Sequence, residues 1–342
     1  MHSFRNDYSE GCHPNIIKAL LDTNLEQQEG YGDDQYCQEA KELIKLKIKN
    51  QNADIHFVSA GTQANLIVIS SILKPFESVI SASTGHINVH ETGAIEATGH
   101  KIETIFSEDG KLNPELIQSI LEKFEDHHMT KPKLVYISNS TEVGTFYSKI
   151  ELVNLSAFCK KNNLYLFMDG ARLGSALCAS INDLAFSDLS ALTDVFYIGG
   201  TKNGALLGEA IIINNNNLKE DFKFHLKQRG ALLSKGRLLG IQFRELFKEN
   251  LYLDLASQAN SMASILSSEI KNLGFEFLSE SKTNQIFPIL PNSIITELSK
   301  DFGFYVWKKI DNKNAAIRLV TSWATKKEVV EKFINTLKTI QP

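Results

Sequence analysis

The chain has 342 residues, of which 43% are hydrophobic and 22% are charged, and its formal net charge is −4. This composition is ordinary for a globular protein, and the scattered basic residues argue against a nucleic-acid-binding or membrane-binding surface. No apolar run reaches the ~20 residues that span a bilayer, and the N-terminus lacks the pattern of a signal peptide. The cysteines form no CxxC pair, so we expect reduced thiols and a cytoplasmic location.

The first two thirds of the chain predict an α/β domain. Helical patterns occur at residues 14–21 and at about 38–49, and a strand, a turn and a helix are expected at 54–66. Apolar runs predict strands at 78–81, 102–106, 134–138, 164–168, 195–198 and 210–213, with helices at 114–124 and 150–161. Alternating strands and helices favour a mostly parallel sheet that is covered on both faces.

The remaining chain predicts a smaller α/β domain. A long amphipathic helix or a helix pair is expected between about 232 and 273, and strands are expected at 285–290, 304–307 and 317–321. A helix at 326–337 closes the chain. We therefore predict a large domain of residues 1–245 with an N-terminal arm, and a small C-terminal domain of residues 246–342.

Two predicted strands end in residues that suit a cofactor. Lys202 follows one strand through Gly199-Gly200-Thr201, and Asp169 ends the strand before it. A lysine that loses solvation can form a Schiff base, and a carboxylate can keep a ring nitrogen protonated. Separately, a lysine on an exposed turn and an aspartate cap are the simpler interpretations. Together they predict a site for pyridoxal 5'-phosphate (PLP), which needs both groups.

Gly61 and Thr62 indicate where a phosphate group binds. They stand at the start of a predicted helix, where free N–H groups and the helix dipole attract anions. An ordinary helix cap is the alternative. The chain contains neither GxGxxG nor GxxxxGK[ST], which weakens a dinucleotide or nucleotide interpretation.

His86 and His90 are spaced as two zinc ligands on one helix face, with Glu91 beside them. No third ligand is evident and the glutamate follows the second histidine, so HExxH is not matched and no metal is expected. A histidine that lies over a cofactor ring is the sharper hypothesis for His86, and a surface histidine is the alternative.

With these residues in view, the chain resembles the threonine aldolase family, PLP-dependent enzymes of fold type I grouped with the β-eliminating lyases. The resemblance spans nearly the whole chain and rests on these stretches, in this order: Tyr31-Gly32-Asp33-Asp34, Gly61-Thr62-Gln63-Ala64-Asn65, His86 with Glu91, Asp169-Gly170-Ala171-Arg172, Lys202 and Arg318-Leu319-Val320-Thr321. It implies PLP as cofactor and a large domain like that of aspartate aminotransferase.

The resemblance also implies roles in holding the cofactor. Lys202 resembles the Schiff-base lysine, Asp169 the partner of the pyridine nitrogen, and His86 the histidine that stacks on the ring. The resemblance assigns further cofactor contacts to Gly61, Thr62, Thr201, Arg172 and Lys235. Lys235 corresponds to an arginine that reaches a neighbouring subunit's cofactor, so a homodimer or homotetramer with shared active sites is implied.

Substrate contacts are implied for Arg172, Arg318, Tyr31 and Asn6, with the arginines binding the carboxylate. Asn6 stands where many members carry a serine. Glu142 stands where better-known members carry a histidine that contacts the substrate hydroxyl. Two interpretations of Glu142 stay open: it accepts the hydroxyl proton, or it is solvated or paired while His86 or a water takes that proton.

The implied activity is cleavage of L-threonine, L-allo-threonine or a related β-hydroxy-α-amino acid to glycine and an aldehyde. The alternatives are another fold-type I activity on the same cofactor (a β-eliminating lyase, a racemase or an aminotransferase) and a non-catalytic PLP-binding protein. The implied partner is a small amino acid, with no nucleic acid and no membrane.

Overall fold

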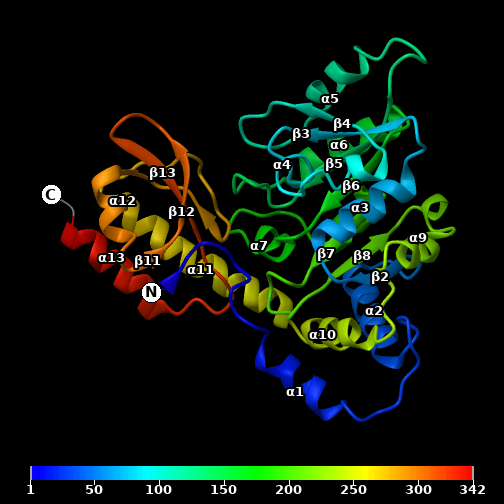
Figure 1. The fold of residues 1–342 in the computed structure, drawn as a ribbon, viewed down its shortest axis with the longest axis horizontal. Coiled ribbons are helices and arrows are strands. Elements are labelled where there is room, and N and C mark those ends of the chain that lie inside the picture. Colours follow the sequence, from blue (N-terminus) through cyan, green and yellow to red (C-terminus); the bar gives the residue numbers. More distant parts are fainter. Residues whose placement is uncertain (1, 341–342) are drawn as a thin grey trace.

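The computed structural model describes residues 2–340, and its larger part is built on a seven-stranded sheet in the order β2-β8-β7-β6-β5-β3-β4, on the right in Figure 1. The strands of this sheet are β2 (Asp54–Val58), β3 (Glu77–Ala82), β4 (Ile102–Ile105), β5 (Lys131–Ser138), β6 (Tyr165–Asp169), β7 (Val195–Gly199) and β8 (Glu209–Ile213). β8 runs antiparallel to β2 and β7, and the other neighbouring pairs are parallel. The expected mostly parallel sheet is therefore confirmed.

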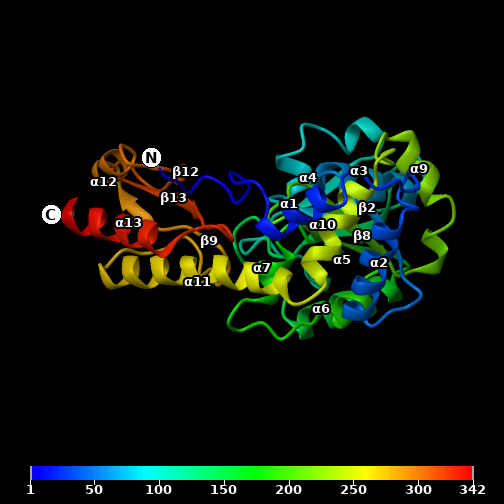
Figure 2. The same ribbon diagram turned by 90° about the horizontal axis from the view of Figure 1, so that it is seen from below.

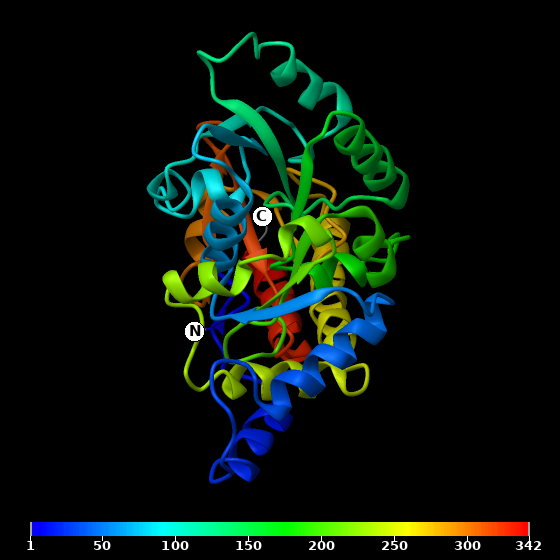
Figure 3. The same cartoon turned by 90° about the vertical axis from the view of Figure 1, so that its right-hand side faces the viewer.

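Helices cover both faces of this sheet (Figure 3). The helices before residue 250 are α1 (Pro14–Asp22), α2 (Gln35–Ile48), α3 (Gly61–Ile72), α4 (His86–Val89), α5 (Pro114–Leu121), α6 (Lys149–Lys161), α7 (Leu173–Leu177), α8 (Phe186–Leu192), α9 (Phe222–Gln228) and α10 (Arg237–Phe247), with 3₁₀ turns η1 (Glu96–Thr98) and η2 (Asn216–Leu218). The sequence pattern does not predict α8 and α9, because each has only 7 residues and a helical period needs a window of about 11.

The inner strands β6 and β7 are apolar on both faces because each face has its own helices. In β6, Leu166 and Met168 pack with α2, α6 and α10, whereas Phe167 packs with α3 and α9. In β7, Phe196 packs on the same face as Leu166, and Tyr197 packs on the same face as Phe167. Alternate side chains of a strand point to opposite faces, so a strand buried on both sides reads as a continuous apolar run.

The C-terminal part forms a second, antiparallel sheet with helices packed against it. Its elements are α11 (Leu251–Asn272), β9 (Gln285–Ile286), β10 (Ile289–Pro291), α12 (Asn292–Leu298), β11 (Phe302–Gly303), β12 (Tyr305–Lys309), β13 (Asn314–Val320) and α13 (Lys327–Ile340). The expected helix pair is confirmed as α10 and α11, and α11 runs from the large sheet into the C-terminal part (Figure 2). The single strand expected at 285–290 is wrong, since β9 and β10 are separated at Pro288, which lacks an N–H for a ladder.

The N-terminal arm packs against the C-terminal part. β1 (His2–Ser3) pairs with β11, and the Phe4 amide donates to Gly303 O at 2.6 Å. Phe4 is fully buried in the hydrophobic cluster of α11, α12, α13 and β13. The predicted boundary after residue 245 lies inside α10, and the division into domains stays a prediction.

None of the helices described between residues 2 and 340 is both long enough and apolar enough to cross a membrane.

Candidate functional site

The carboxyl ends of the parallel strands bring the predicted site residues to one edge of the large sheet. Gly61 follows β2, His86 follows β3, Glu142 follows β5, Asp169 ends β6, and Lys202 follows β7. Parallel strands end at the same edge, and this edge is where ligands bind in open α/β sheets.

Asp169 is buried and its carboxylate accepts several hydrogen bonds. The donors are the Tyr136 hydroxyl at 2.6 Å, the Tyr197 hydroxyl, Asn65 Nδ2 at 3.1 Å and the Ala171 amide at 2.9 Å. Asn65 belongs to α3, on the face of the sheet to which Asp169 points. An acceptor surrounded by donors is held in its ionised form.

His86 is connected to Asp169 through two side chains. Its Nδ1 lies 2.8 Å from Glu91 Oε1, and Asn65 Nδ2 donates both to this oxygen at 2.7 Å and to Asp169. Burial alone would raise the pKa of Asp169, but His86 and the donated hydrogen bonds hold this pKa below its ordinary value. The sequence pointed to Glu91 as a neighbour of His86, in the zinc spacing and in the family resemblance, but not to its contact with Asn65.

Lys202 is half-buried at this edge. Burial and the nearby Arg172 lower the pKa of the Lys202 amine, while Asp7, Asp169 and Glu209 act in the opposite direction. A lysine with a lowered pKa has more of the neutral amine that attacks carbonyl carbons. This is the electrostatic environment that the sequence predicts for Lys202.

Arg172 is oriented by Asp7, which the sequence analysis did not identify. Arg172 Nε donates to Asp7 Oδ2 at 2.7 Å, and Nη2 donates to Oδ1 at 3.0 Å. Asn284 Nδ2 donates to Asp7 Oδ2 at 2.9 Å, and the Asp7 side chain is buried. The only sequence signal for Asp7 is its place directly after Asn6.

Arg318 reaches the same region from β13 of the second sheet. Its Nη2 donates to Arg5 O at 3.2 Å, and its guanidinium lies 4.6 Å from the Trp307 ring centroid and 5.6 Å from that of Tyr305. Its Nε is buried without a hydrogen-bond partner among the described residues. Burial and Arg172 lower the pKa of Arg318, so two arginines lie near one another. Such a pair suits an anionic ligand.

Glu142 lies beside His86, and its surroundings raise its pKa, as a general base requires. Its Oε1 accepts hydrogen bonds from the His86 amide at 3.1 Å and from Ser138 Oγ at 2.8 Å. Burial and Asp169 raise the pKa of Glu142. The raised pKa agrees with the interpretation as a base, although the role itself stays a prediction.

The residues that are predicted to bind the phosphate group lie where β2 and β7 end. Among the described residues, no side chain caps the amides at the start of α3, where Gly61 and Thr62 lie. The Thr201 hydroxyl accepts a hydrogen bond from the Gly208 amide at 3.0 Å. Uncapped N–H groups at the start of a 12-residue helix form an anion site, so the geometry suits the predicted role.

The other predicted residues have local contacts. Asn6 Oδ1 accepts hydrogen bonds from the Tyr8 amide at 3.1 Å and Ser9 Oγ at 2.8 Å. The exposed Tyr31 lies under Lys227 Nζ, 4.4 Å from the ring centroid, and its amide donates to Ser234 O at 3.3 Å, next to Lys235. Within residues 2–340, no hydrogen bond, ion pair or ring contact joins Tyr31 to Lys202.

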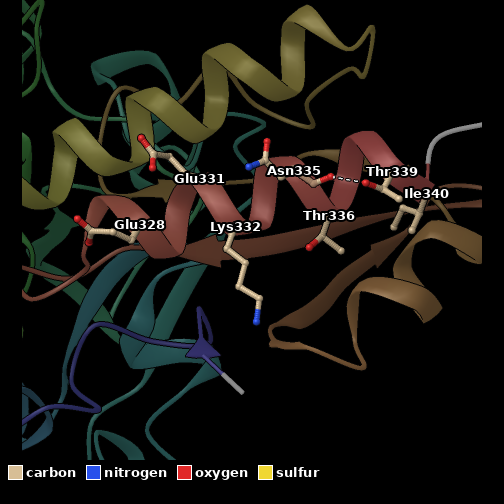
Figure 4. A pocket seen from close by; sticks show the side chains of 7 residues that line it. All are labelled: Glu328, Glu331, Lys332, Asn335, Thr336, Thr339 and Ile340. Atoms are coloured by element: carbon tan, nitrogen blue, oxygen red, sulfur yellow. Dashed lines mark hydrogen bonds between the residues drawn. The ribbon is translucent and has the colours of Figure 1, made fainter.

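Two other features of the described residues give no support for a further site. In the described part of the chain, no three His, Cys, Asp or Glu side chains form a group that could hold a metal ion. A groove of about 500 Å³ follows α13 (Figure 4). It is lined by Glu328, Glu331, Lys332, Asn335, Thr336, Thr339 and Ile340. All of these come from one helix, so no other element brings a functional group to them.

The architecture is that of the PLP fold-type I proteins, as expected. The fold matches histidinol-phosphate aminotransferase from Clostridium acetobutylicum with a TM-score of 0.74 over 99% of both chains. At 14% sequence identity this likeness concerns the fold alone.

The chain belongs to the β-eliminating lyase family, whose model matches residues 4–292. It is 34% identical over 342 residues to the low specificity L-threonine aldolase of Pseudomonas sp. (strain NCIMB 10558), covering 98% of this chain and 97% of the relative. A threonine aldolase structure from Leishmania major has 49% sequence identity and a TM-score of 0.98, with 99% of both chains covered. The family resemblance inferred from the motifs is therefore confirmed.

Proposed function

We propose that this protein is a PLP-dependent aldehyde-lyase that cleaves L-threonine, L-allo-threonine or a related β-hydroxy-α-amino acid to glycine and an aldehyde. The observation that carries the proposal is the convergence of Lys202, the buried Asp169 and two arginines at one sheet edge. The likeness to threonine aldolases over almost the whole chain supports this activity.

The residues at the sheet edge fit PLP by their chemistry. Lys202 supplies a primary amine, Asp169 a buried carboxylate, and α3 an uncapped N-terminus at Gly61 and Thr62 for a phosphate. These residues would hold the cofactor, with His86 against its ring and Thr201 at its phosphate. When bound, PLP supplies the electron sink that makes cleavage of a Cα–Cβ bond feasible.

Arg172 and Arg318 bind and orient the substrate carboxylate in this proposal. Asp7 holds two nitrogens of Arg172 and so fixes the direction of the remaining donors. The unpartnered Nε of Arg318 needs an acceptor, because a buried donor without one costs free energy. A carboxylate that bridges these groups would place the substrate in one orientation.

Glu142 is proposed to accept the β-hydroxyl proton. Its raised pKa makes its carboxylate a stronger base than that of an ordinary glutamate. The hydrogen bonds from Ser138 and the His86 amide fix its position. Asp169 keeps its negative charge, because its pKa lies below the ordinary value, and so would favour a protonated ring nitrogen.

The proposal includes a homodimer or homotetramer in which Lys235 and Tyr31 of one subunit complete the site of another. Its support within one chain is that Lys235 and Tyr31 are exposed and neighbouring, and that Tyr31 has no direct contact with Lys202 among the described residues. A cytoplasmic location is also proposed, since all four cysteines are free, and cell fractionation tests it.

Product analysis with L-threonine tests the activity directly. Aldol cleavage yields glycine and acetaldehyde in equal amounts, whereas elimination yields a keto acid and ammonia. Lys202→Ala is the matched control and should reduce turnover by a factor on the order of 10³ or more. A keto acid as the main product, or equal activity in this variant, would refute the proposed function.

A further inference from the structure

Glu209 is a buried carboxylate that the proposed mechanism does not use. It is the first residue of β8, it is 4% exposed, and it pairs with Gly199 of β7 and with Val58 of β2. Because β8 is antiparallel, its first residue lies at the edge where β7 and β2 end. Glu209 therefore lies at the same edge of the sheet as Lys202.

Hydrogen bonds connect Glu209 to the turn that carries Lys202. Glu209 Oε2 accepts a hydrogen bond from the Gly200 amide at 3.0 Å, and this amide also donates to Gly208 O at 2.9 Å. The Thr201 amide donates to Gly208 O at 3.2 Å, and the Thr201 hydroxyl accepts from the Gly208 amide at 3.0 Å. The residue before Lys202 and the residue before Glu209 are thus bound to one another.

The charge of Glu209 is linked to that of Lys202. Burial raises the pKa of Glu209, and Lys202 is the cation that most opposes this effect. Conversely, burial and Arg172 lower the pKa of Lys202, and this effect is opposed by the negative charges of Asp7, Asp169 and Glu209. A buried carboxylate is costly without a partner of opposite charge, so Lys202 and Glu209 stabilise one another's charged forms.

The other titratable groups around Glu209 are Asp169 of β6, Tyr197 of β7 and Tyr252 of α11. Tyr252 donates to Gly199 O at 3.0 Å. Burial raises the pKa of both tyrosine hydroxyls, so they stay neutral while Lys202 titrates. Asp169 is already ionised in that range, because its pKa is lowered.

We propose that Glu209 is a positioning residue that holds the Gly200–Lys202 turn and supplies the negative charge that balances Lys202 when its amine is free. The inference rests on the proposed function of Lys202 as the amine that binds the cofactor. The charge-balancing part of this role applies when Lys202 is not joined to the cofactor, as in the cofactor-free chain, and it requires no substrate.

Glu209→Gln separates the charge from the hydrogen bond, because glutamine retains an acceptor for the Gly200 amide. The full-length chain, freed of cofactor, is trace-labelled with acetic anhydride at a series of pH values, and the Lys202 peptide is quantified by mass spectrometry. Only the neutral amine reacts. We expect the pH at which Lys202 labelling is half-maximal, its midpoint, to be about one unit lower in Glu209→Gln than in the unsubstituted chain. At any pH below both midpoints, Lys202 of the variant should then be labelled about tenfold faster.

Glu77→Gln is the matched control. Glu77 is also a buried glutamate that accepts a backbone N–H, from Lys74 at 2.9 Å, but it begins β3 at the opposite edge of the sheet. Its variant should leave the Lys202 midpoint unchanged. An equal Lys202 midpoint in Glu209→Gln and the unsubstituted chain would overturn the proposal, even if Glu209→Gln lowered thermal stability.

Glu209→Asp provides a second test that does not require the glutamine variant to fold. It keeps the charge and shortens the side chain, so the Lys202 midpoint should stay close to that of the unsubstituted chain, within about 0.3 pH units. A fall of a full unit would overturn the proposal. The labelling uses no amino acid substrate, so its result is independent of product analysis with L-threonine. If the unsubstituted protein cleaves L-threonine but Glu209→Gln leaves the Lys202 midpoint unshifted, only the role of Glu209 is refuted and the proposed function stands.

Discussion

At the scale of single residues, each charged group in the site has a neighbour that sets its protonation or its direction. Asp169 is held ionised by hydroxyl and amide donors, and Asp7 orients Arg172. Glu142 differs from Asp169 in the direction of the effect, because burial and the charge of Asp169 favour its neutral form.

Asp169→Asn should lower kcat for L-threonine by about 100-fold while PLP still binds. The neutral amide no longer favours a protonated ring nitrogen, and its NH₂ group faces donors that need an acceptor. Steady-state kinetics and the PLP content of the purified variant measure both effects. Tyr136→Phe is the control, since it removes one hydrogen bond but keeps the charge, and its loss should be smaller. A kcat of Asp169→Asn close to that of the unsubstituted protein would exclude this role.

Arg318→Lys should raise KM for L-threonine by about tenfold and leave kcat within a few-fold, because lysine lacks the forked donors that bind a carboxylate. Initial-rate kinetics measure this change. Thermal unfolding of the same variant is the control, because Arg318 also donates to Arg5 O. If the variant lost thermal stability while KM held, Arg318 would be a structural contact between the arm and β13.

Glu142→Gln should lower the rate of aldol cleavage by about 100-fold, because glutamine keeps the acceptor for Ser138 and His86 but removes the base. The cleavage rate of the unsubstituted enzyme should fall as pH drops through the raised pKa of Glu142, where the carboxylate becomes protonated. This acidic limb should disappear in the variant. Unchanged kcat with both L-threonine and L-allo-threonine would remove Glu142 from the mechanism and favour His86 or a water.

At the scale of elements, α3 connects two parts of the site. Its uncapped N-terminus lies where a phosphate is expected, and Asn65, on its first turns, binds Asp169 and Glu91. The helix therefore aligns the predicted phosphate end with the predicted ring end of the cofactor. Its start tolerates little added volume, because a Cβ at Gly61 would lie 3.1 Å from the Tyr197 hydroxyl.

Gly61→Ala should weaken PLP binding by about tenfold, since the added methyl group displaces Tyr197 and narrows the approach to the helix amides. The free energy of unfolding should change little, because the higher helix propensity of alanine offsets the cost of displacing Tyr197. Equilibrium titration with PLP and denaturant unfolding measure the two effects. Gly11→Ala is the control, because nothing lies within 4 Å of its added Cβ. Equal PLP affinity in both variants would contradict the prediction.

At the scale of the whole molecule, the site joins distant parts of the chain. The N-terminal arm provides Asp7, the large sheet provides Lys202 and Asp169, and the second sheet provides Arg318. Phe4 anchors the arm in the C-terminal hydrophobic cluster. In the proposed oligomer, a second subunit would add Lys235 to this site.

Subunit mixing tests that contribution. Lys202→Ala and Lys235→Ala should each be nearly inactive alone, whereas mixed dimers isolated after their co-expression should have about half the activity of the unsubstituted protein, because one of the two sites of each mixed dimer is intact. Co-purification with two different affinity tags followed by an acetaldehyde assay measures this. Activity of the mixture equal to the sum of the separate variants would show that Lys235 serves no neighbouring site.

The sequence by itself determined most of the elements and much of the chemistry at their ends. Apolar runs that stop at Asp169 and shortly before Lys202 indicate strand ends, and Gly61 and Thr62 mark a helix start. These signals are local, because periodicity and end residues are set by neighbours along the chain. They were sufficient to predict the fold class and to place Lys202 and Asp169 at strand ends, whereas Glu142 was identified only through the family resemblance.

Only the tertiary structure decided which distant side chains meet. The contacts of Asp7 with Arg172, of Asn65 with Asp169 and of Gly200 with Glu209 depend on strand order and register. An apolar strand has the same pattern whether it runs parallel or antiparallel, so the pattern of β8 does not reveal which end carries Glu209 to the site. Its direction became visible only when β8 was paired between β2 and β7, because pairing, not periodicity, sets the direction of a strand in a sheet.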